Sequence, residues 1–340
     1  MKSMWIFLPS ICLALAHIAG DNVAVVPDMA VILGQDIYVV TILAYIVFGS
    51  IISGITAWIG VKSGHELVIV VRKLFGSRGK KISAFVILAI CIPASILTGG
   101  FYSGWLTNVF LGIPLNLAIP ICILVFSLLA NGYAHELLKL SNYIALLLVP
   151  TVLAIFLSYG FTFPARSFDV GEINWLLVSA LVGYNAGGMR SALIVETAAY
   201  LSRKGCKTIL LVVLAKVVEG LFTLGIVHLI LSAGIHGPLA ISKFANEVAG
   251  SVGFFVFNLI LFCTFMSAMV PAMTVNARQM KILTGLSPKI SLLISGIMIY
   301  LGTMLDFSTI IEIMGFSGMI TVVFILYTAY ALHKYGLNHS

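Results

Sequence analysis

Long apolar stretches separated by short polar segments run along the whole chain. Most apolar stretches reach about 20 residues, which is the length that a helix needs to cross the hydrocarbon core of a bilayer. The polar segments carry Gly, Pro, Asn or charged residues, whose backbone groups would lack partners in lipid. The pattern predicts an all-α membrane protein with ten transmembrane helices, at about 4–34, 37–60, 83–110, 115–131, 142–161, 173–201, 208–232, 252–276, 290–305 and 307–332.

The composition supports a membrane protein and excludes a water-soluble one. Of 340 residues, 61% are apolar and 9% are charged, and the mean hydropathy is +1.13. A soluble domain carries about 25% charged residues and could not bury this much apolar surface. Since the predicted helices leave no room for a soluble domain, we expect a single transmembrane domain over 1–340.

The net charge of +7 is distributed asymmetrically. If Lys2 is cytoplasmic and ten helices follow, most basic residues fall on the cytoplasmic side, as the positive-inside rule requires. The distribution therefore predicts an inner (plasma) membrane protein of bacterial type with both termini in the cytoplasm, rather than a nucleic-acid-binding protein. The predicted cytoplasmic residues are Lys2, Lys62, Arg72, Lys73, Arg78, Lys80, Lys81, Lys139, Arg203, Lys204, Lys207, Arg278, Lys281, Lys289 and Lys334.

Two further features of the sequence do not change this interpretation. The cysteines have no metal-binding spacing, so we interpret them as reduced packing residues; they are Cys12, Cys91, Cys122, Cys206 and Cys263. The N-terminus imitates a signal peptide, with Lys2, an apolar run and the small-residue triplet 14–16. We expect it to be retained, because cleavage would spoil the even helix count.

Two of the predicted helices are interrupted by glycine and polar residues at mid-membrane depth. The first interruption reads His17-Ile18-Ala19-Gly20-Asp21-Asn22, and the second, in predicted helix six, reads Gly183-Tyr184-Asn185-Ala186-Gly187-Gly188-Met189-Arg190. An unwound helix needs such residues, because its freed backbone groups must face a cavity. The alternative is that the glycines only let helices pack closely.

The two interruptions occupy equivalent places in two halves of five predicted helices, at about 1–162 and 170–334. An odd number of helices per half gives the halves opposite orientations in the membrane. This arrangement is typical of inverted-repeat transporters, which bind their solute at the membrane midplane between broken helices.

Three stretches of the chain resemble known transporter families. The stretches WLLVSALVGYNAGGMRSALI at 175–194 and PLAISKFANEVAG at 238–250 resemble YkvI-like proteins of the amino acid/polyamine/organocation superfamily, which has the LeuT fold. The stretch IGVKSGHELVIVVRKLFGSRGKKI at 59–82 is similar to nucleobase:cation symporters of family 1. The resemblance implies a 5+5 inverted repeat with discontinuous helices 1 and 6. It also implies a possible Na⁺ site at Thr264 and Ser267, with H⁺ as the alternative coupling ion.

The interruptions supply the candidate solute-binding residues, which are His17, Ala19, Gly20, Asp21, Tyr184, Asn185, Gly187, Gly188 and Arg190. Arg190 follows the second break at a helix N-terminus, which favours an anionic group such as a carboxylate. Asp21 could bind an ammonium group, a cation or a proton, or it could cap the following half-helix. A structural ion pair of Arg190 with Asp21 or Glu196 is the alternative to solute binding. His17 could also gate a proton.

Other predicted features surround this site. Lys216 and Glu219, three residues apart in a helix, are expected to form a structural pair or a proton relay. Glu312 is expected to be a buried carboxylate. The segment 235–248 is predicted to form a re-entrant external lid, and the segment 65–74 a cytoplasmic amphipathic helix near anionic lipid.

The sequence therefore predicts a secondary active transporter that moves a small polar solute, most simply an amino acid, by symport with Na⁺ or H⁺ and by alternating access. A nucleobase permease and a ligand-sensing membrane subunit are the alternatives. We expect no enzyme and no cofactor beyond the coupling ion, because no HExxH, GxSxG or paired-aspartate motif is present. The expected partners are the solute and the lipid bilayer.

Overall fold

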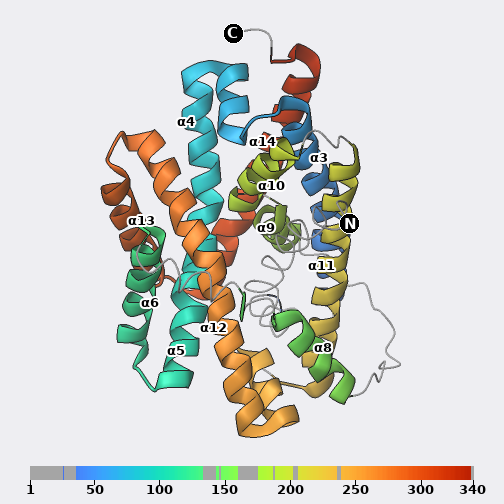
Figure 1. Ribbon diagram of the computed structural model, residues 1–340, viewed down its shortest axis with the longest axis vertical. Helices are drawn as coiled ribbons and strands as arrows, with labels where there is room; N and C mark the ends of the chain where they lie inside the picture. Colours follow the sequence, from blue (N-terminus) through green and yellow to red (C-terminus); the bar gives the residue numbers. More distant parts are fainter. Residues whose placement is uncertain are drawn as a thin grey trace.

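The structure of the chain, a computed structural model, describes residues 26, 36–132, 143–144, 147–159, 175–186, 188–201, 206–235 and 239–337. Each predicted span after the first contains one or more helices of the described chain (Figure 1). The helices are α2 Asp36–Thr41, η1 Ile42–Val47, α3 Phe48–Ser63, α4 Leu67–Ser95, η2 Ile96–Tyr102, α5 Ser103–Leu111, α6 Leu115–Ala130, α8 Leu148–Tyr159, α9 Trp175–Ala186, α10 Gly188–Tyr200, α11 Cys206–Ala233, α12 Ala240–Thr284, α13 Pro288–Gly302 and α14 Phe307–Tyr335. The labels η1 and η2 mark π-helical turns.

Five helical stretches within these ranges are long and apolar enough to cross a membrane. They are Ile37–Ser63, Leu67–Leu111, Cys206–Ala233, Ala240–Thr284 and Phe307–Tyr335. Many of their large apolar side chains lie on the outside, as do those of shorter helices; Val252 is 77% exposed and Leu157 is 80% exposed. A soluble protein rarely exposes so continuous an apolar surface, whereas lipid covers it at no cost. The multi-pass membrane architecture predicted from the sequence is thereby supported.

Two of these stretches have the same length and the same kind of kink. Leu67–Leu111 and Ala240–Thr284 each contain 45 residues, and each begins with a short segment that ends at a glycine. Gly76 has φ 69° and ψ −159°, and Gly250 has φ 62° and ψ −165°, a region of backbone conformation that essentially only glycine adopts. Figure 1 shows the two short segments at opposite ends of the molecule. Matching kinks at opposite ends fit an inverted repeat.

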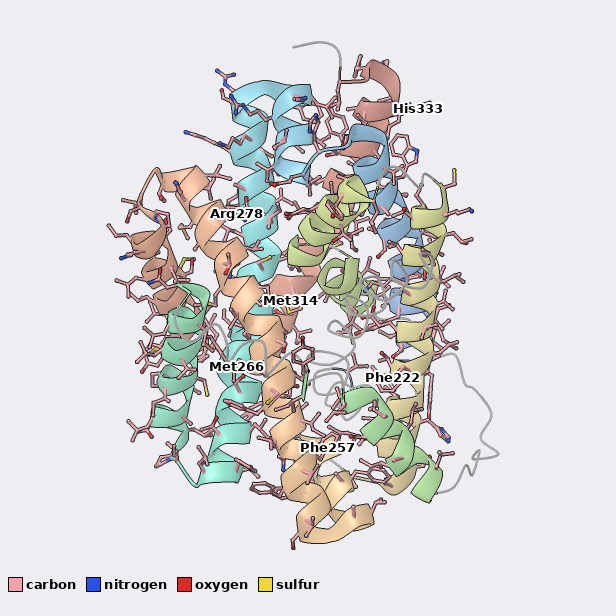
Figure 2. The ribbon with its side chains drawn as sticks, in the orientation of Figure 1. Phe222, Phe257, Met266, Arg278, Met314 and His333 are labelled. Carbon is pink, nitrogen blue, oxygen red and sulfur yellow. The ribbon has the colours of Figure 1, made fainter. Side chains whose placement is uncertain are left out.

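The short segment of α4 contains the predicted amphipathic helix. Its Phe75 ring stacks on Tyr327 of α14 with ring centroids 5.4 Å apart, and Glu66, which precedes it, lies 4.0 Å from Arg278 of α12. Figure 2 places Arg278 on the part of α12 that faces this end of the molecule. The segment is therefore attached to two long helices as well as being amphipathic.

The corresponding short segment of α12, residues 240–249, covers most of the stretch that was predicted to form a re-entrant lid. It is helical from Ala240, and Ser242 donates a hydrogen bond to Oδ1 of Asn258 beyond the kink. Both side chains are buried. This segment is a helix folded back on its own long helix, because Gly250 permits the sharp turn, and its role as a lid stays a prediction.

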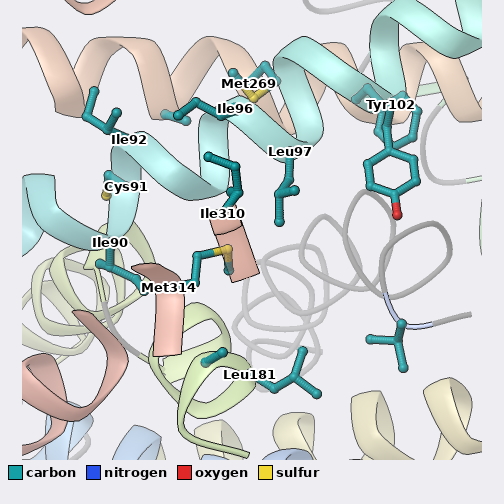
Figure 3. Close-up of a cluster of buried hydrophobic side chains, with 14 of the residues drawn as sticks. Ile90, Cys91, Ile92, Ile96, Leu97, Tyr102, Leu181, Met269, Ile310 and Met314 are labelled. Atoms are coloured by element: carbon teal, nitrogen blue, oxygen red, sulfur yellow. The ribbon is translucent and has the colours of Figure 1, made fainter. Parts of the chain in front are cut away.

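The interior contains a continuous apolar core formed by the long helices. Figure 3 shows part of it, where side chains of α4, η2, α9, α12 and α14 meet. Leu97 of η2, Leu181 of α9 and Met314 of α14 are completely or almost completely buried there. Residues of α9 up to Val182 are thus part of this core.

Candidate functional site

The predicted break in helix six falls between α9, which ends at Ala186, and α10, which begins at Gly188. Figure 1 shows α9 nearly end-on and α10 running obliquely, so the helix axis changes direction there. Tyr184 and Asn185 belong to the last turn of α9, while Gly188 and Arg190 belong to the first turn of α10. The structure therefore has two helix ends at the predicted position. Gly187 lies outside the described residues, as do His17, Ala19, Gly20 and Asp21.

The position of α9 is fixed by unusually close contact with α14. A Cβ atom on Gly183 would overlap the backbone of Gly318, and a Cβ on Gly318 would overlap the carbonyl of Ser179. The Ser179 hydroxyl donates to the carbonyl of Gly315 across the interface, at 3.1 Å. Small residues that let backbones touch are the usual means of tight helix packing in membranes. The α9 half of the broken helix is thereby joined to α14 just before the break.

Two of the long helical stretches contain a π-helical turn. The first, η1, contacts α9 and α11, and just after it Ser50 of α3 donates to the carbonyl of Tyr45 five residues back. Just after η2, Ser103 of α5 donates to the carbonyl of Thr98 with the same spacing. π-helical turns are rare and occur frequently at functional sites. The sequence analysis did not predict these turns. The available signals for η2 were Pro93, three residues before it, and the pair Gly99-Gly100 within it.

Aromatic side chains gather where η2 and α5 face α12 and α14. The Tyr102 ring is completely buried and lies edge-on to Trp105, with centroids 5.3 Å apart. Phe265 of α12 and Phe307 of α14 each lie 6.4 Å from Tyr102. Such rings offer flat apolar faces beside one polar hydroxyl. The sequence signal for this cluster was the Phe-Tyr-x-x-Trp run at 101–105.

The two residues of the possible cation site lie one turn apart on α12. Thr264 is completely buried, and no described residue forms a hydrogen bond with its hydroxyl. Ser267 is partly buried and donates to the carbonyl of Cys263 at 2.9 Å. Hard cations prefer oxygen ligands of this kind. The two hydroxyls could therefore supply part of the ligand set of a Na⁺ site. The described part of the chain contains no group of three or more His, Cys, Asp or Glu that could hold a metal ion.

The predicted pair in helix seven is confirmed as an ion pair. Lys216 Nζ lies 2.6 Å from Glu219 Oε2, and the two side chains are 7% and 1% exposed. The next residue, Gly220, packs against Tyr45 and Ile46 of η1 so closely that a Cβ would collide with them. The pair is therefore buried inside the helix assembly beside a π-helical turn, and Lys216 does not extend toward the membrane surface.

One prediction about a carboxylate is wrong. Glu312 of α14 is exposed rather than buried. The buried face of α14 near this position is formed by Met314, Gly315 and Gly318, which contact α9 and the core. Glu312 lies beside that face, so it is no candidate for an interior site.

Comparison with known proteins identifies the fold. No protein-family model matches the chain, and no curated protein sequence matches it. Among solved structures, it is similar to Mhp1, a nucleobase-cation-symport-1 family transporter, in a closed conformation with bromovinylhydantoin bound. The identity is 16% and the TM-score 0.59, and the match covers 95% of this chain and 74% of that chain.

An inward-facing conformation of Mhp1 is similar as well, at 15% identity and a TM-score of 0.60, with 93% of this chain and 73% of the other covered. Likeness at this level of identity concerns the fold. The all-α fold with the LeuT-like arrangement predicted from the sequence is confirmed, and the chain shares it with these two transporter structures.

Proposed function

We propose that the chain is a secondary active transporter that moves a small polar solute together with a cation by alternating access. The observation that supports this most strongly is the broken helix α9–α10 within the LeuT-like fold, with α9 packed closely against α14 and in contact with the π-helical turn η1. Broken helices expose helix ends and free backbone groups that can bind a polar solute in the membrane interior. We expect transport and not catalysis, as in the structural neighbours.

We propose that the end of the molecule carrying the short segment of α4 faces the cytoplasm. The described basic residues at helix ends on that side include Lys62, Arg78, Arg278 and Lys334, whereas Lys243 lies at the opposite end on the short segment of α12. Positive residues concentrate on the cytoplasmic side of inner-membrane proteins. The proposal places both termini in the cytoplasm and the short segment of α12 outside, where it would cover the solute pathway.

For the solute, we infer that a flat heterocycle such as a nucleobase fits the described residues better than an amino acid. Tyr102 lies near Trp105, Phe265 of α12 and Phe307 of α14, and aromatic rings can stack on flat bases. Mhp1 binds a hydantoin, which is also a flat heterocycle. The amino acid alternative depends on Asp21 and Arg190, which would bind an ammonium and a carboxylate group.

For the cation, we infer Na⁺ bound in part by Thr264 and Ser267. The support is the buried hydroxyl of Thr264, since an oxygen without a hydrogen-bond partner in apolar surroundings is costly unless another group binds it. The alternative is H⁺, with the Lys216–Glu219 pair as the titrating group.

Uptake by the purified chain in proteoliposomes tests the function. Radiolabelled nucleobases, hydantoins and amino acids would be offered with an inward Na⁺ gradient, an inward H⁺ gradient or no gradient. We expect accumulation of a flat heterocycle above its external concentration only with a Na⁺ gradient. Accumulation of an amino acid would replace the solute proposal, and binding without gradient-driven accumulation of any solute would instead indicate a ligand-sensing subunit.

A further inference from the structure

An apolar groove of about 820 Å³ lies between α3, α11 and α14. It is open at the surface of the helix assembly, where Ile51, Leu326 and Tyr330 of its lining are exposed. Ile46 and Val47 of η1 lie at one end of the groove. The groove is distinct from the site described above, because it faces the side of the protein that the bilayer surrounds.

The groove has the length of one membrane leaflet. Along the stretch Ile37–Ser63, its lining extends from Ile46 to Trp58. At a rise of roughly 1.5 Å per residue, that distance is about 18 Å. Half of the hydrocarbon core of a bilayer is about 15 Å thick. An acyl chain of a single leaflet therefore fits along the groove from the membrane surface to the midplane.

The surface end of the groove is aromatic and basic. Trp58 and His333 lie in contact there, with ring centroids 6.3 Å apart, and Figure 2 shows His333 at the upper end of the molecule. The ammonium group of Lys334 lies 5.7 Å from the centre of the Tyr330 ring. Aromatic side chains of this kind concentrate at the level of the lipid headgroups.

Each of the three helices that line the groove brings a lysine to this end. Lys62 follows Trp58 by one turn on α3, Lys207 lies in the first turn of α11, and Lys334 follows His333 on α14. The acidic residues within these three helices are Glu219, which is buried with Lys216, and Glu312, which lies near the other end of α14. Glu196 lies on the neighbouring α10, and Glu66 after α3 lies 4.0 Å from Arg278. The three lysines outnumber the remaining carboxylate, so this end of the groove has a net positive charge.

We propose that the groove binds an anionic phospholipid of the cytoplasmic leaflet, with an acyl chain along α3 and the phosphate near Lys62, Lys207 and Lys334. Basic pockets between transmembrane helices bind anionic headgroups in this way. The acyl chain would end at Ile46, whose neighbour Tyr45 is buried against Gly220 and next to the Lys216–Glu219 pair. The lipid would thus support the π-helical turn from the membrane side.

Lipid binding to the full-length protein, purified and depleted of lipid in detergent, tests the headgroup part. Retention of phosphatidylglycerol and phosphatidylcholine would be measured by native mass spectrometry, with the unfolding temperature in each lipid as a second readout. We expect wild-type protein to prefer phosphatidylglycerol. The triple variant K62Q/K207Q/K334Q should bind it about tenfold more weakly or worse. The control K80Q/K81Q/K289Q removes the same charge from the same end of the molecule outside the groove, and it should bind as wild type does.

A second pair of variants tests the groove itself. Ala329→Phe fills the groove from α14, whereas Val323→Phe adds a ring at an exposed position of the same helix outside it. We expect Ala329→Phe to lose the retained lipid and Val323→Phe to keep it. Equal weakening by the two lysine variants would show general surface attraction and overturn the proposal. Unchanged lipid retention in Ala329→Phe would overturn it as well.

Discussion

Gly183 of α9 lies against Gly318 of α14 with no space for a side chain on either residue. The contact is close to the end of α9, so the last turn of that helix cannot shift without α14. Met314, one turn earlier on α14, is buried in the core beside α9. The position of the helix break therefore depends on both residues being glycine, because even the methyl group of an alanine would not fit.

We predict that Gly183→Ala destabilises the protein and impairs uptake. The added methyl group would overlap backbone atoms of Gly318, which cannot rotate away, and overpacking of this kind costs about 1–3 kcal/mol. The unfolding temperature in detergent and the uptake rate measure the effect. Gly296→Ala is the control, because a Cβ there would meet its nearest neighbours at 3.4 Å or more, an ordinary contact distance. Equal behaviour of the two variants would contradict the packing argument.

A second prediction concerns the kink that folds the short segment of α12 back. Gly250→Ala should cost about 1–3 kcal/mol of stability, because its backbone conformation is essentially restricted to glycine. Space is not the cause, since no atom lies within 4 Å of a Cβ at this position. Chemical unfolding would measure the loss, with Ser251→Ala on the neighbouring exposed residue as the control. If Gly250→Ala is as stable as its control, the kink is not under conformational constraint.

The third prediction concerns the ion pair of α11. Removing one charge by Lys216→Met or Glu219→Met leaves the other buried, which costs about 3–5 kcal/mol. The double variant Lys216→Met/Glu219→Met should recover much of that stability, because neither charge remains in the interior. Thermal unfolding of all three variants measures the coupling between the sites. Additive losses in the double variant would show that the two residues act independently.

The same variants distinguish a structural pair from a proton relay. If the pair is structural, the double variant should keep solute uptake driven by a Na⁺ gradient. Loss of uptake in a variant that remains folded would instead favour the relay.

The sequence predicted the helical spans and the place of the second helix break because both follow from composition along the chain. Apolar length alone determines a membrane span, and Gly187-Gly188 beside polar residues indicates a break. The Lys216–Glu219 pair was predictable because residues three apart in a helix are neighbours.

Features that depend on contacts between distant segments were not predictable. The approach of Gly183 to Gly318 requires the packing of two helices that are far apart in the sequence. The exposure of Glu312 likewise depends on which face of α14 contacts α9, and the apolar residues on all sides of that helix do not indicate it. The π-helical turns arise from one extra residue in a helical turn, which leaves no periodic signal in so apolar a sequence.

The last prediction tests the coupling ion at Thr264. Thr264→Val keeps the shape of the side chain and removes only the hydroxyl, for which the described residues provide no hydrogen-bond partner. If that oxygen binds Na⁺, the Na⁺ concentration for half-maximal solute binding should rise at least about fivefold, the lower range of coupling between linked sites. Stability without Na⁺ should be unchanged or higher, because a buried polar group is replaced by an apolar one.

Thr274→Val is the matched control, since it makes the same change on the same helix at a hydroxyl that donates to the carbonyl of Val270. Its Na⁺ dependence should equal that of the wild type. An unchanged Na⁺ dependence in Thr264→Val would remove this hydroxyl from the cation site. Proton coupling would then be the better explanation, because the buried Lys216–Glu219 pair would be the remaining described candidate for a coupling group.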